Sequence, residues 1–396
     1  MKALLLENIH PFAVSMLQES GIEVETRSGA LDEDELITAL EGVDLLGVRS
    51  KTEVTERVLR SAPHLQAVGA FCIGTNQVAL QVAAERGVVV FNAPFSNTRS
   101  VVELVIGEII AMARRLTEKD TDLHAGVWNK DATGSHEIRG RAIGIVGYGN
   151  IGSQLSVVAE MLGLRVFFYD TEDKLALGNA HRCESLDELL DVAEVVTLHV
   201  DGRSGNAGFF GAEQFERMRP RALFLNLSRG FVVDYEALRE RLMSGHIAGA
   251  AVDVFPKEPK VKGEPFVSPL QGIPNVILTP HVGGSTQEAQ EDIGRFVATK
   301  LRDFVQLGTT TLNVNLPALT PAPASGGRRV THLHVNIPGV LAKVNSVLAT
   351  HGVNIEGQTL ATSGDNGYVV TDVKDIPDAA VRELTDLPET IRLRVL

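Results

Sequence analysis

A glycine-rich hexapeptide between a strand pattern and a helix pattern limits the fold of this chain more than any other feature. The hexapeptide, Gly147-Tyr148-Gly149-Asn150-Ile151-Gly152, follows an apolar strand pattern over residues 142–146 and opens a helix pattern over 151–162. In a G-x-G-x-x-G turn the first glycine permits the tight bend, the second lets the backbone approach a diphosphate, and the third lets helix and strand pack closely. Glycine-rich hexapeptides also occur by chance in plain turns, so the context carries the weight. The strand–turn–helix order predicts a parallel α/β domain that binds a dinucleotide.

The acidic residue after this motif selects between two dinucleotides. The next strand pattern ends at Asp170, 18 residues after Gly152, about where the ribose-binding acid stands in such domains. A carboxylate accepts hydrogen bonds from ribose hydroxyls and repels the additional phosphate of NADP, and no arginine follows Asp170 directly. We therefore expect NAD as the cofactor. The alternative is a solvated aspartate at the end of a strand.

Strand and helix patterns alternate along most of the chain, which at 396 residues is too long for one hydrophobic core. The strand patterns of this alternating part cover residues 3–6, 44–48, 65–69, 88–91, 142–146, 165–169, 195–200, 223–227, 250–254 and 276–278. Such βα alternation predicts two doubly wound parallel-sheet domains with helices on both faces. A stretch rich in proline, alanine and threonine, residues 316–325, and then Gly326-Gly327 lead to a last segment with βαββαβ order, which is ferredoxin-like.

Charge and cysteine content narrow the partners and the compartment. The net charge of -13 disfavours nucleic acid and anionic membrane surfaces as partners. The two cysteines, Cys72 and Cys183, have no metal-binding or redox spacing, so we expect no metal site and a reducing, cytoplasmic location. The N-terminus has a strand pattern without the apolar stretch of a signal peptide. The most apolar stretch, residues 104–113, is interrupted by Glu108 and is too short to span a bilayer.

Three polar residues near the ends of later strand patterns form a candidate catalytic set: Arg229, Glu258 and His281. Oxidation of a 2-hydroxy acid needs a cation for the carboxylate and a base for the hydroxyl proton. An arginine fork binds carboxylates with two hydrogen bonds, and a histidine exchanges protons near neutral pH. A neighbouring glutamate raises the histidine pKa and orients the ring. Taken singly, each residue is more simply a strand cap, a solvated turn or a loop histidine, and only their joint occurrence after the dinucleotide motif favours catalysis.

Three long stretches make the chain resemble a known family. Residues 69–78, 91–101 and 281–290 are similar to segments of the D-isomer-specific 2-hydroxyacid dehydrogenases, and in particular of bacterial phosphoglycerate dehydrogenases with one C-terminal ACT domain. The resemblance covers nearly the whole chain. It implies a flavodoxin-like substrate domain split between residues 1–97 and 284–326, a Rossmann NAD domain over 98–283, and a ferredoxin-like ACT domain over 327–396.

The resemblance also implies roles for individual residues. Arg229 would bind the substrate carboxylate or 2-oxo group, Glu258 would pair with the histidine, and His281 would be the acid/base. The site would lie in a cleft between the substrate and NAD domains. The implied cofactor-binding residues, together with the motif glycines, are Gly147, Gly149, Asn150, Ile151, Gly152, Asp170, Leu227, Ser228, Asp253, Gly283 and Gly284.

A phosphorylated substrate, D-3-phosphoglycerate, is the expected reactant, oxidised to 3-phosphohydroxypyruvate in the first step of L-serine biosynthesis. Segments 49–51 and 97–100 supply cationic and polar groups and match the substrate-lining stretches of the family. The substrate-binding residues that we expect are Arg49, Ser50, Gly74, Asn97 and Arg99. The alternative is that these arginines are solvated surface cations. Reduction of 2-oxoglutarate is an expected side activity.

The ACT-like segment predicts feedback control by L-serine. His334, Asn336 and Asn354 match the family's serine-contacting positions, and asparagine amides both donate and accept hydrogen bonds. Val335 and Ile337 depart from the family pattern, which puts the affinity for serine in doubt. The family implies a homo-oligomer, most often a tetramer. Trp128 lies in a segment resembling a subunit-contact arm, although a buried tryptophan would explain it equally well.

Two other functions compete with this prediction. One is a glyoxylate, hydroxypyruvate or 4-phosphoerythronate reductase, which the ACT-like segment and residues 96–100 disfavour. The other is an NAD-sensing binding protein related to corepressors of the same fold. Such a protein would not need the Arg229, Glu258 and His281 set, so a turnover assay separates an enzyme from a binding protein.

Overall fold

The computed structural model describes residues 1–259, 263–323 and 326–396, and the described chain divides into two compact units. Unit 1 comprises Met1–Ser96 and Gln290–Leu396, and unit 2 comprises Asn97–Ala289. The last two residues of the proline-rich stretch predicted over 316–325 lie outside the described residues. None of the helices in the described part combines the length and the apolar character needed to cross a membrane.

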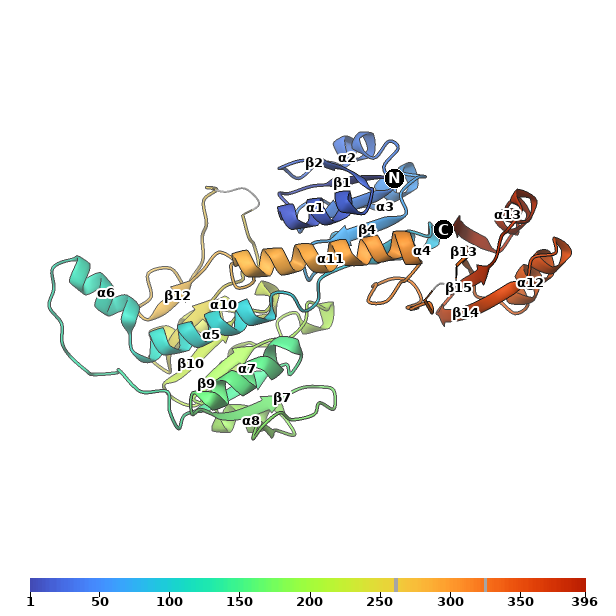
Figure 1. Ribbon diagram of the computed structural model, residues 1–396. Coiled ribbons are helices and arrows are strands. Elements are labelled where there is room, and N and C mark those ends of the chain that lie inside the picture. Colours follow the sequence, from blue (N-terminus) through green and yellow to red (C-terminus); the bar gives the residue numbers. More distant parts are fainter. Residues whose placement is uncertain (260–262, 324–325) are drawn as a thin grey trace. The chain divides into compact units, whose positions relative to one another are not determined.

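Unit 1 opens with a five-stranded parallel sheet (Figure 1). Its elements are β1 (Lys2–Leu5), α1 (Pro11–Glu19), β2 (Glu23–Thr26), α2 (Glu33–Ala39), β3 (Leu45–Val48), α3 (Glu56–Ser61), β4 (Ala67–Ala70), α4 (Leu80–Glu85) and β5 (Val89–Phe91). The strand order is β2-β1-β3-β4-β5, so the winding direction reverses between β1 and β3. In open α/β sheets, ligands bind beyond the carboxyl ends of the strands at such a reversal.

The long helix α11 (Gln287–Leu307) closes one face of this sheet. Its apolar residues Ile293, Val297 and Leu301 share a buried cluster with Leu5 and Phe91. The fit is close, because a Cβ built on Gly69 of β4 would lie 2.7 Å from a methyl group of Val297. A second cluster, centred on Leu4, Leu46 and Val68, fills the opposite face. Successive side chains of each strand therefore point to opposite faces of the sheet and pack into two separate apolar clusters.

The C-terminal part of unit 1 is a four-stranded antiparallel sheet with two helices, as the βαββαβ pattern predicts. Its elements are β13 (Arg328–Val335), α12 (Val340–Thr350), β14 (Ile355–Ser363), β15 (Asn366–Val373), α13 (Asp378–Thr385) and β16 (Thr390–Val395), with strand order β14-β15-β13-β16. The Tyr368 hydroxyl donates to the carbonyl of Gly308, 2.7 Å away. Arg329 pairs with Asp372 and also donates to the carbonyl of Leu307.

Unit 2 is a seven-stranded parallel sheet with the order β12-β11-β10-β9-β6-β7-β8. Its elements are α5 (Thr98–Ala113), α6 (Leu116–His124), β6 (Ala142–Val146), α7 (Asn150–Met161), β7 (Arg165–Tyr169), β8 (His181–Arg182), α8 (Leu186–Val192), β9 (Val195–Leu198), η1 (Ser204–Asn206), α9 (Ala212–Arg217), β10 (Ala222–Asn226), η2 (Gly230–Val232), α10 (Tyr235–Met243), β11 (Ile247–Val252) and β12 (Val276–Leu278). This is the doubly wound order, with the reversal between β6 and β9. The fold class predicted from the sequence is confirmed.

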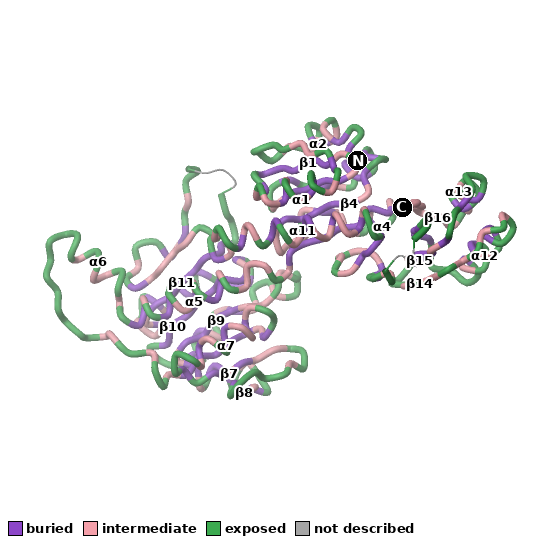
Figure 2. Tube along the Cα trace, viewed as in Figure 1, coloured by how far each residue is buried: buried purple, intermediate pink, exposed green. Residues whose placement is uncertain are grey.

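Helices cover both faces of the unit 2 sheet, and one helix stays outside them. Helices α5 and α7 bury apolar residues in one cluster, whereas α8, α9 and α10 contribute to the other. In Figure 2 the central strands β6, β9 and β10 are buried, but α6 and the chain that follows it are mostly exposed. Trp128 in that segment is 81% exposed, so the explanation by burial within this chain is wrong.

Candidate active site

The glycine loop takes the conformation that a dinucleotide requires. Gly147 has φ 92, and a Cβ there would lie 2.6 Å from the carbonyl oxygen of His199, so only glycine fits the turn. A Cβ on Gly152 would collide with the Gly147 carbonyl. A Cβ on Gly149 would meet nothing within 4 Å, so space is open beside that residue. Helix α7 begins there with no side-chain cap, which leaves N–H groups of its first turn for an anion.

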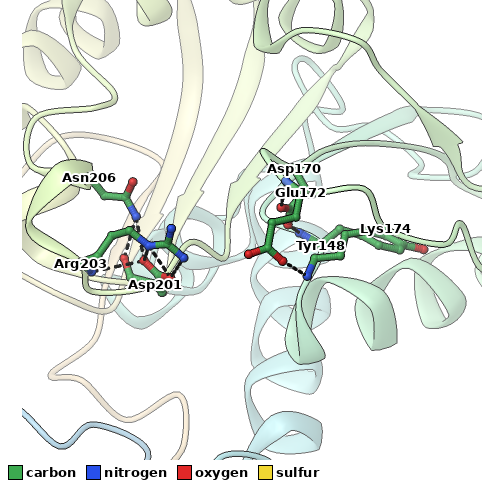
Figure 3. A network of polar contacts seen from close by, with 7 residues as sticks. All are labelled: Tyr148, Asp170, Glu172, Lys174, Asp201, Arg203 and Asn206. Carbon is green, nitrogen blue, oxygen red and sulfur yellow. Dashed lines mark hydrogen bonds and ion pairs between the residues drawn. The ribbon is translucent and has the colours of Figure 1, made fainter. Parts of the chain in front are cut away.

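Asp170, at the end of β7, holds the glycine loop and faces the same space (Figure 3). Its carboxylate accepts hydrogen bonds from the backbone N–H of Tyr148 at 2.7 Å and of Glu172 at 2.9 Å. Glu172 in turn pairs with Lys174 at 2.5 Å. On the other side of Figure 3, Arg203 is bound to Asp201 by its Nε at 2.8 Å.

These groups line a cavity of about 250 Å³ at the reversal between β6 and β9. Its lining includes Gly147 and Gly149 of the loop, Asp170 and Glu172 after β7, and His199 after β9. Burial lowers the pKa of His199 to about 3, so this ring is neutral, and its Nε2 bonds to the Thr197 hydroxyl. The open glycine loop and the uncapped helix start suit a diphosphate, and the acidic side suits ribose hydroxyls, so the residues fit NAD.

The structure brings Glu258 and His281 together. One carboxylate oxygen of Glu258 lies 2.9 Å from Nδ1 of His281, and the other accepts from the backbone N–H of Phe255 at 3.0 Å. The side chains are partly open to solvent, 51% exposed for His281 and 36% for Glu258. With Nδ1 bonded to the carboxylate, Nε2 is the free nitrogen for a substrate proton.

Electrostatics adjusts both groups for proton transfer. The hydrogen bond that His281 donates to the Glu258 carboxylate raises the pKa of His281 above its ordinary value, although burial and the charge of Arg229 oppose the shift. Burial acts to raise the pKa of Glu258, but the hydrogen bonds from His281 and Phe255 outweigh it, so this pKa is lowered. The pair therefore has an ionised carboxylate beside a more basic imidazole.

Asp253, directly after β11, organises the loop that carries His281. Its carboxylate accepts from the Thr279 hydroxyl at 2.6 Å and from the backbone N–H groups of Val282 and Gly283, both at 2.8 Å. Its carbonyl accepts from the N–H of His281, also at 2.8 Å. His281 is held with φ 56, in the left-handed region that non-glycine residues rarely adopt.

Arg229 follows β10 and is fixed through its neighbours. Its guanidinium donates to the Ser228 carbonyl at 2.7 Å, and its own carbonyl accepts from the buried Asn226 side chain at 3.1 Å. Asn226 also bonds to the hydroxyl of Tyr235, which donates to the carbonyl of Val254. Among the described residues Arg229 makes no hydrogen bond to Glu258 or His281, yet its charge affects the pKa of both. Leu227 and Ser228 are buried at this strand end.

The predicted substrate-binding residues fall in both units. In unit 1, Gln77 links Arg49 and Gly74 by donating to both carbonyl groups, at 2.6 and 3.3 Å, and Ser50 next to Arg49 is exposed. In unit 2, Asn97 packs directly against Gly284. Arg99 forms an exposed ion pair with Glu103 at 2.6 Å. That pairing is the behaviour of a solvated surface cation.

The predicted serine residues lie at the end of β13 and after α12. His334 is buried, and its Nδ1–H donates to the Val335 carbonyl at 2.9 Å. Its buried Nε2 has no hydrogen-bond partner among the described residues. Asn336 donates to the carbonyl of Gly364 at 3.0 Å. Asn354 is exposed. A buried nitrogen without a hydrogen-bond partner costs free energy unless a ligand or water satisfies it.

Several groups at the site were not anticipated from sequence. Glu172, Lys174, Asp201 and Arg203 surround the cofactor cavity, although only their position just after strand ends could have indicated it. Glu108 of α5 is 4% exposed and has no hydrogen-bond partner among the described residues. Burial, and then the nearby charge of Asp253, raise its pKa to about 8. The sequence signal for this buried acid was a glutamate inside an otherwise apolar helix pattern.

Comparisons with known proteins give matches along the whole chain. Residues 106–283 match the family model "D-isomer specific 2-hydroxyacid dehydrogenase, NAD binding domain", and residues 330–392 match an "AHAS small subunit-like ACT domain". The D-3-phosphoglycerate dehydrogenase of Escherichia coli K12 is 49% identical over 400 residues, covering 100% of this chain and 97% of that protein. The Haemophilus influenzae enzyme of the same name is 47% identical, with the same coverage. The expectation of NAD is confirmed by the family model.

Solved structures match 77 to 80% of the chain. The TT0316 protein of Thermus thermophilus is 30% identical, with a TM-score of 0.70 over 77% of this chain and 97% of that one. D-2-hydroxyisocaproate dehydrogenase gives a TM-score of 0.72 at 22% identity, over 80% of this chain and 100% of that one. The second likeness shows the fold alone.

Proposed function

Because this chain belongs to the D-isomer specific 2-hydroxyacid dehydrogenase family, we propose that it oxidises D-3-phosphoglycerate to 3-phosphohydroxypyruvate with NAD. The family membership makes it an NAD-dependent dehydrogenase. The choice of substrate rests on relatives of full length, 44 to 49% identical, that carry the name D-3-phosphoglycerate dehydrogenase. The single structural observation that supports the chemistry is the Glu258–His281 pair beside Arg229.

When bound, NAD supplies the acceptor for the hydride that leaves C2 of the substrate. His281 acts as the base, because Glu258 holds the proton of a neutral imidazole on Nδ1 and leaves the Nε2 lone pair free. Nε2 takes the hydroxyl proton as the C2–O bond becomes a carbonyl. The imidazolium that forms is stabilised by the ionised Glu258. In the reverse direction the same group returns the proton.

Arg229 binds the substrate carboxylate in this proposal, and the Arg49–Ser50 segment binds the phosphate. A guanidinium suits both groups because its fork matches two oxygens of a carboxylate or phosphate. The segment begins where β3 ends, at the reversal of the unit 1 sheet, which is where such sheets place ligands. Asn97 is retained as a substrate contact, whereas the ion pair of Arg99 with Glu103 makes Arg99 the weaker candidate.

The test is NADH formation from NAD with D-3-phosphoglycerate, compared with D-glycerate, which has the same skeleton without the phosphate. We expect turnover of the phosphorylated substrate with a far higher kcat/KM. Arg49→Ala should raise KM for 3-phosphoglycerate much more than it changes kinetics with D-glycerate. Equal turnover of both substrates by the native enzyme would remove the phosphate assignment but leave the dehydrogenase chemistry.

The ACT segment extends the proposal to regulation. We propose that L-serine binds at His334, Asn336 and Asn354 and inhibits the enzyme. We also propose that the enzyme is a homo-oligomer, most often a tetramer in this family, and that it works in the cytoplasm. The Nε2 of His334 supports a ligand site in the ACT segment, since it is buried beside Gly367 and has no hydrogen-bond partner in the described part of the chain. Calorimetric titration with L-serine, and its effect on the initial rate, test this part.

A further inference from the structure

Glu7 is a buried acidic residue at the end of β1, outside the catalytic groups described above. It is 8% exposed and has φ 61, and the next residue, Asn8, has φ 53. Two consecutive non-glycine residues in the left-handed region are uncommon, and such backbone strain persists only where surrounding contacts enforce it. The contacts of the Glu7 side chain identify what enforces it.

The Glu7 carboxylate accepts hydrogen bonds from three backbone N–H groups of the segment that follows β3. Oε1 accepts from Thr52 at 2.9 Å and from Arg49 at 3.2 Å, and Oε2 accepts from Lys51 at 3.1 Å. The Arg49 guanidinium also reaches back to the Glu7 carbonyl, at 3.5 Å. Hydrogen bonds to an ionised acceptor are roughly twice as strong as neutral ones. One buried carboxylate thus fixes the backbone of residues 49–52.

A second side chain holds the same segment from its carbonyl side. Gln77 donates to the Arg49 carbonyl at 2.6 Å. Glu7 and Arg49 both lie just beyond the carboxyl ends of neighbouring strands, β1 and β3, at the reversal of the sheet. At this position a ligand is expected from topology alone.

The carboxylate also decides which groups of the segment can meet an anion. The N–H groups of residues 49, 51 and 52 are already satisfied by Glu7, so they are not offered to a phosphate. The groups of the segment left to meet an anion are then its side chains, among them the half-buried Arg49 and the exposed Ser50. Recognition of an anion by this segment therefore depends on how its side chains, Arg49 among them, are placed by the backbone that Glu7 holds.

We propose that Glu7 is a positioning residue, whose buried carboxylate anchors residues 49–52 so that Arg49 is held ready for the phosphate of the substrate. This inference rests on the proposed function, because the phosphate role of Arg49 belongs to it. Glu7 does not touch the substrate and takes no part in proton or hydride transfer.

The test is Glu7→Gln in the full-length enzyme. The amide keeps one acceptor oxygen but turns an NH2 group toward a backbone N–H, and it removes the charge from the remaining bonds. We expect KM for 3-phosphoglycerate to rise roughly tenfold or more, since small misplacements of binding groups have effects of this size. We expect kcat, and kcat/KM for D-glycerate, to stay within about twofold, because Arg229 and His281 are untouched.

Asp44→Asn is the matched control. Asp44 directly precedes β3, at the amino ends of the strands of the same sheet, whereas Glu7 lies beyond their carboxyl ends. The Asp44 carboxylate accepts from the backbone N–H of Lys2 at 2.8 Å and from the Gln66 side chain at 3.0 Å. The same carboxylate-to-amide change there should leave both substrates' kinetics unaltered. If Glu7→Gln does not yield folded enzyme, Gln77→Leu loosens the same segment from its carbonyl side and should give the same selective rise in KM.

Combining Glu7→Gln with Arg49→Ala separates this inference from the proposed function. If Glu7 acts through Arg49, adding Glu7→Gln to Arg49→Ala changes KM no further. If Arg49→Ala raises KM for 3-phosphoglycerate and Glu7→Gln does not, the inference is overturned and the proposed function stands. If Arg49→Ala itself has no effect on KM for 3-phosphoglycerate, the inference is overturned together with the phosphate role of Arg49, while the dehydrogenase chemistry of the proposed function stands. A fall in thermal stability with equal losses on both substrates would show a structural role only.

Discussion

At the scale of single residues, the backbone of His281 shows how the candidate base is held. Its left-handed conformation, φ 56, is fixed because its N–H bonds to the Asp253 carbonyl while the Asp253 carboxylate takes the next two N–H groups. The ring is then fixed by Glu258. Backbone and side chain are restrained by different partners, so each can be perturbed separately.

Replacing Glu258 by Gln should move the pH profile of oxidation. His281 must be neutral to accept a proton, so kcat/KM is lost as pH falls through the pKa of His281. The hydrogen bond to Glu258 raises this pKa above its ordinary value, and it outweighs the opposite effects of burial and of Arg229. Glu258→Gln removes the charge, so the acid limb should shift to lower pH while kcat falls roughly a hundredfold, the scale of lost acid–base catalysis. A pH series of initial rates checks both. An unmoved acid limb would mean that another group titrates.

Glu108 offers a stability prediction with a defined sign. Its pKa rises from 4.5 unfolded to about 8 folded, chiefly by burial and then by the Asp253 charge. The folded state therefore keeps the Glu108 proton up to a higher pH than the unfolded state, and the free energy of unfolding falls as pH rises from about 4.5 to 8. Glu108→Gln should match the native enzyme near pH 5 and exceed it near pH 8 by up to a few kcal/mol, at about 1.4 kcal/mol per pKa unit. Thermal unfolding at both pH values measures this; a constant difference would contradict it.

Residue chemistry allowed the candidate set to be predicted, but not its geometry. Glu258 and His281 could be proposed because an acid–imidazole pair suits proton transfer, although 23 residues separate them. Their 2.9 Å contact could not be foreseen, since it depends on the Asp253 hydrogen bonds that shape the loop. The anchoring role of Glu7 was equally hidden, because β1 and β3 become neighbours only in the folded sheet.

At the scale of elements, two glycines of the β6–α7 turn are needed for different reasons, one for packing and one for cofactor binding. Gly152→Ala would drive a methyl group into the Gly147 carbonyl, so we expect a destabilised unit 2 and reduced yield of folded enzyme. Gly149 has an ordinary φ of -79 and open space at its Cβ, so Gly149→Ala should leave the melting temperature unchanged. It should raise KM for NAD roughly tenfold, because the methyl group occupies space meant for the diphosphate. Unchanged NAD kinetics in Gly149→Ala would place the diphosphate elsewhere.

Sequence periodicity predicted the buried elements and missed the exposed ones. Strands such as β6 and β10 are apolar along their length because helices cover both faces of the sheet. Strand β2, Glu-Val-Glu-Thr, lies at the sheet edge and has only one apolar residue, so no pattern marks it. Helix α6 has no buried residue and therefore lacks the apolar stripe that identifies a helix.

At the scale of the whole molecule, the candidate catalytic and serine-binding residues belong to different units. His281 lies in unit 2, whereas His334, Asn336 and Asn354 lie in unit 1. In the proposed regulation, L-serine would therefore contact residues of unit 1 and not the proton-transfer groups of unit 2. If L-serine inhibits from those residues, its effect requires an equilibrium between states of the protein that bind serine with different affinity.

This separation makes the effect of Asn354→Ala specific. Asn354 is exposed, so removing its amide should leave folding, kcat and KM without serine unchanged, while the serine concentration for half inhibition rises roughly tenfold or more, which corresponds to about 1.4 kcal/mol of lost binding. Linkage adds a stricter requirement in the native enzyme: the factor by which serine changes the substrate Kd must equal the factor by which substrate changes the serine Kd. Calorimetric titrations of each ligand with and without the other measure the two factors.

Equal factors that both become one in Asn354→Ala would establish coupling through this residue. Inhibition that persists in the variant at the native serine concentration would place the regulatory site elsewhere in the chain.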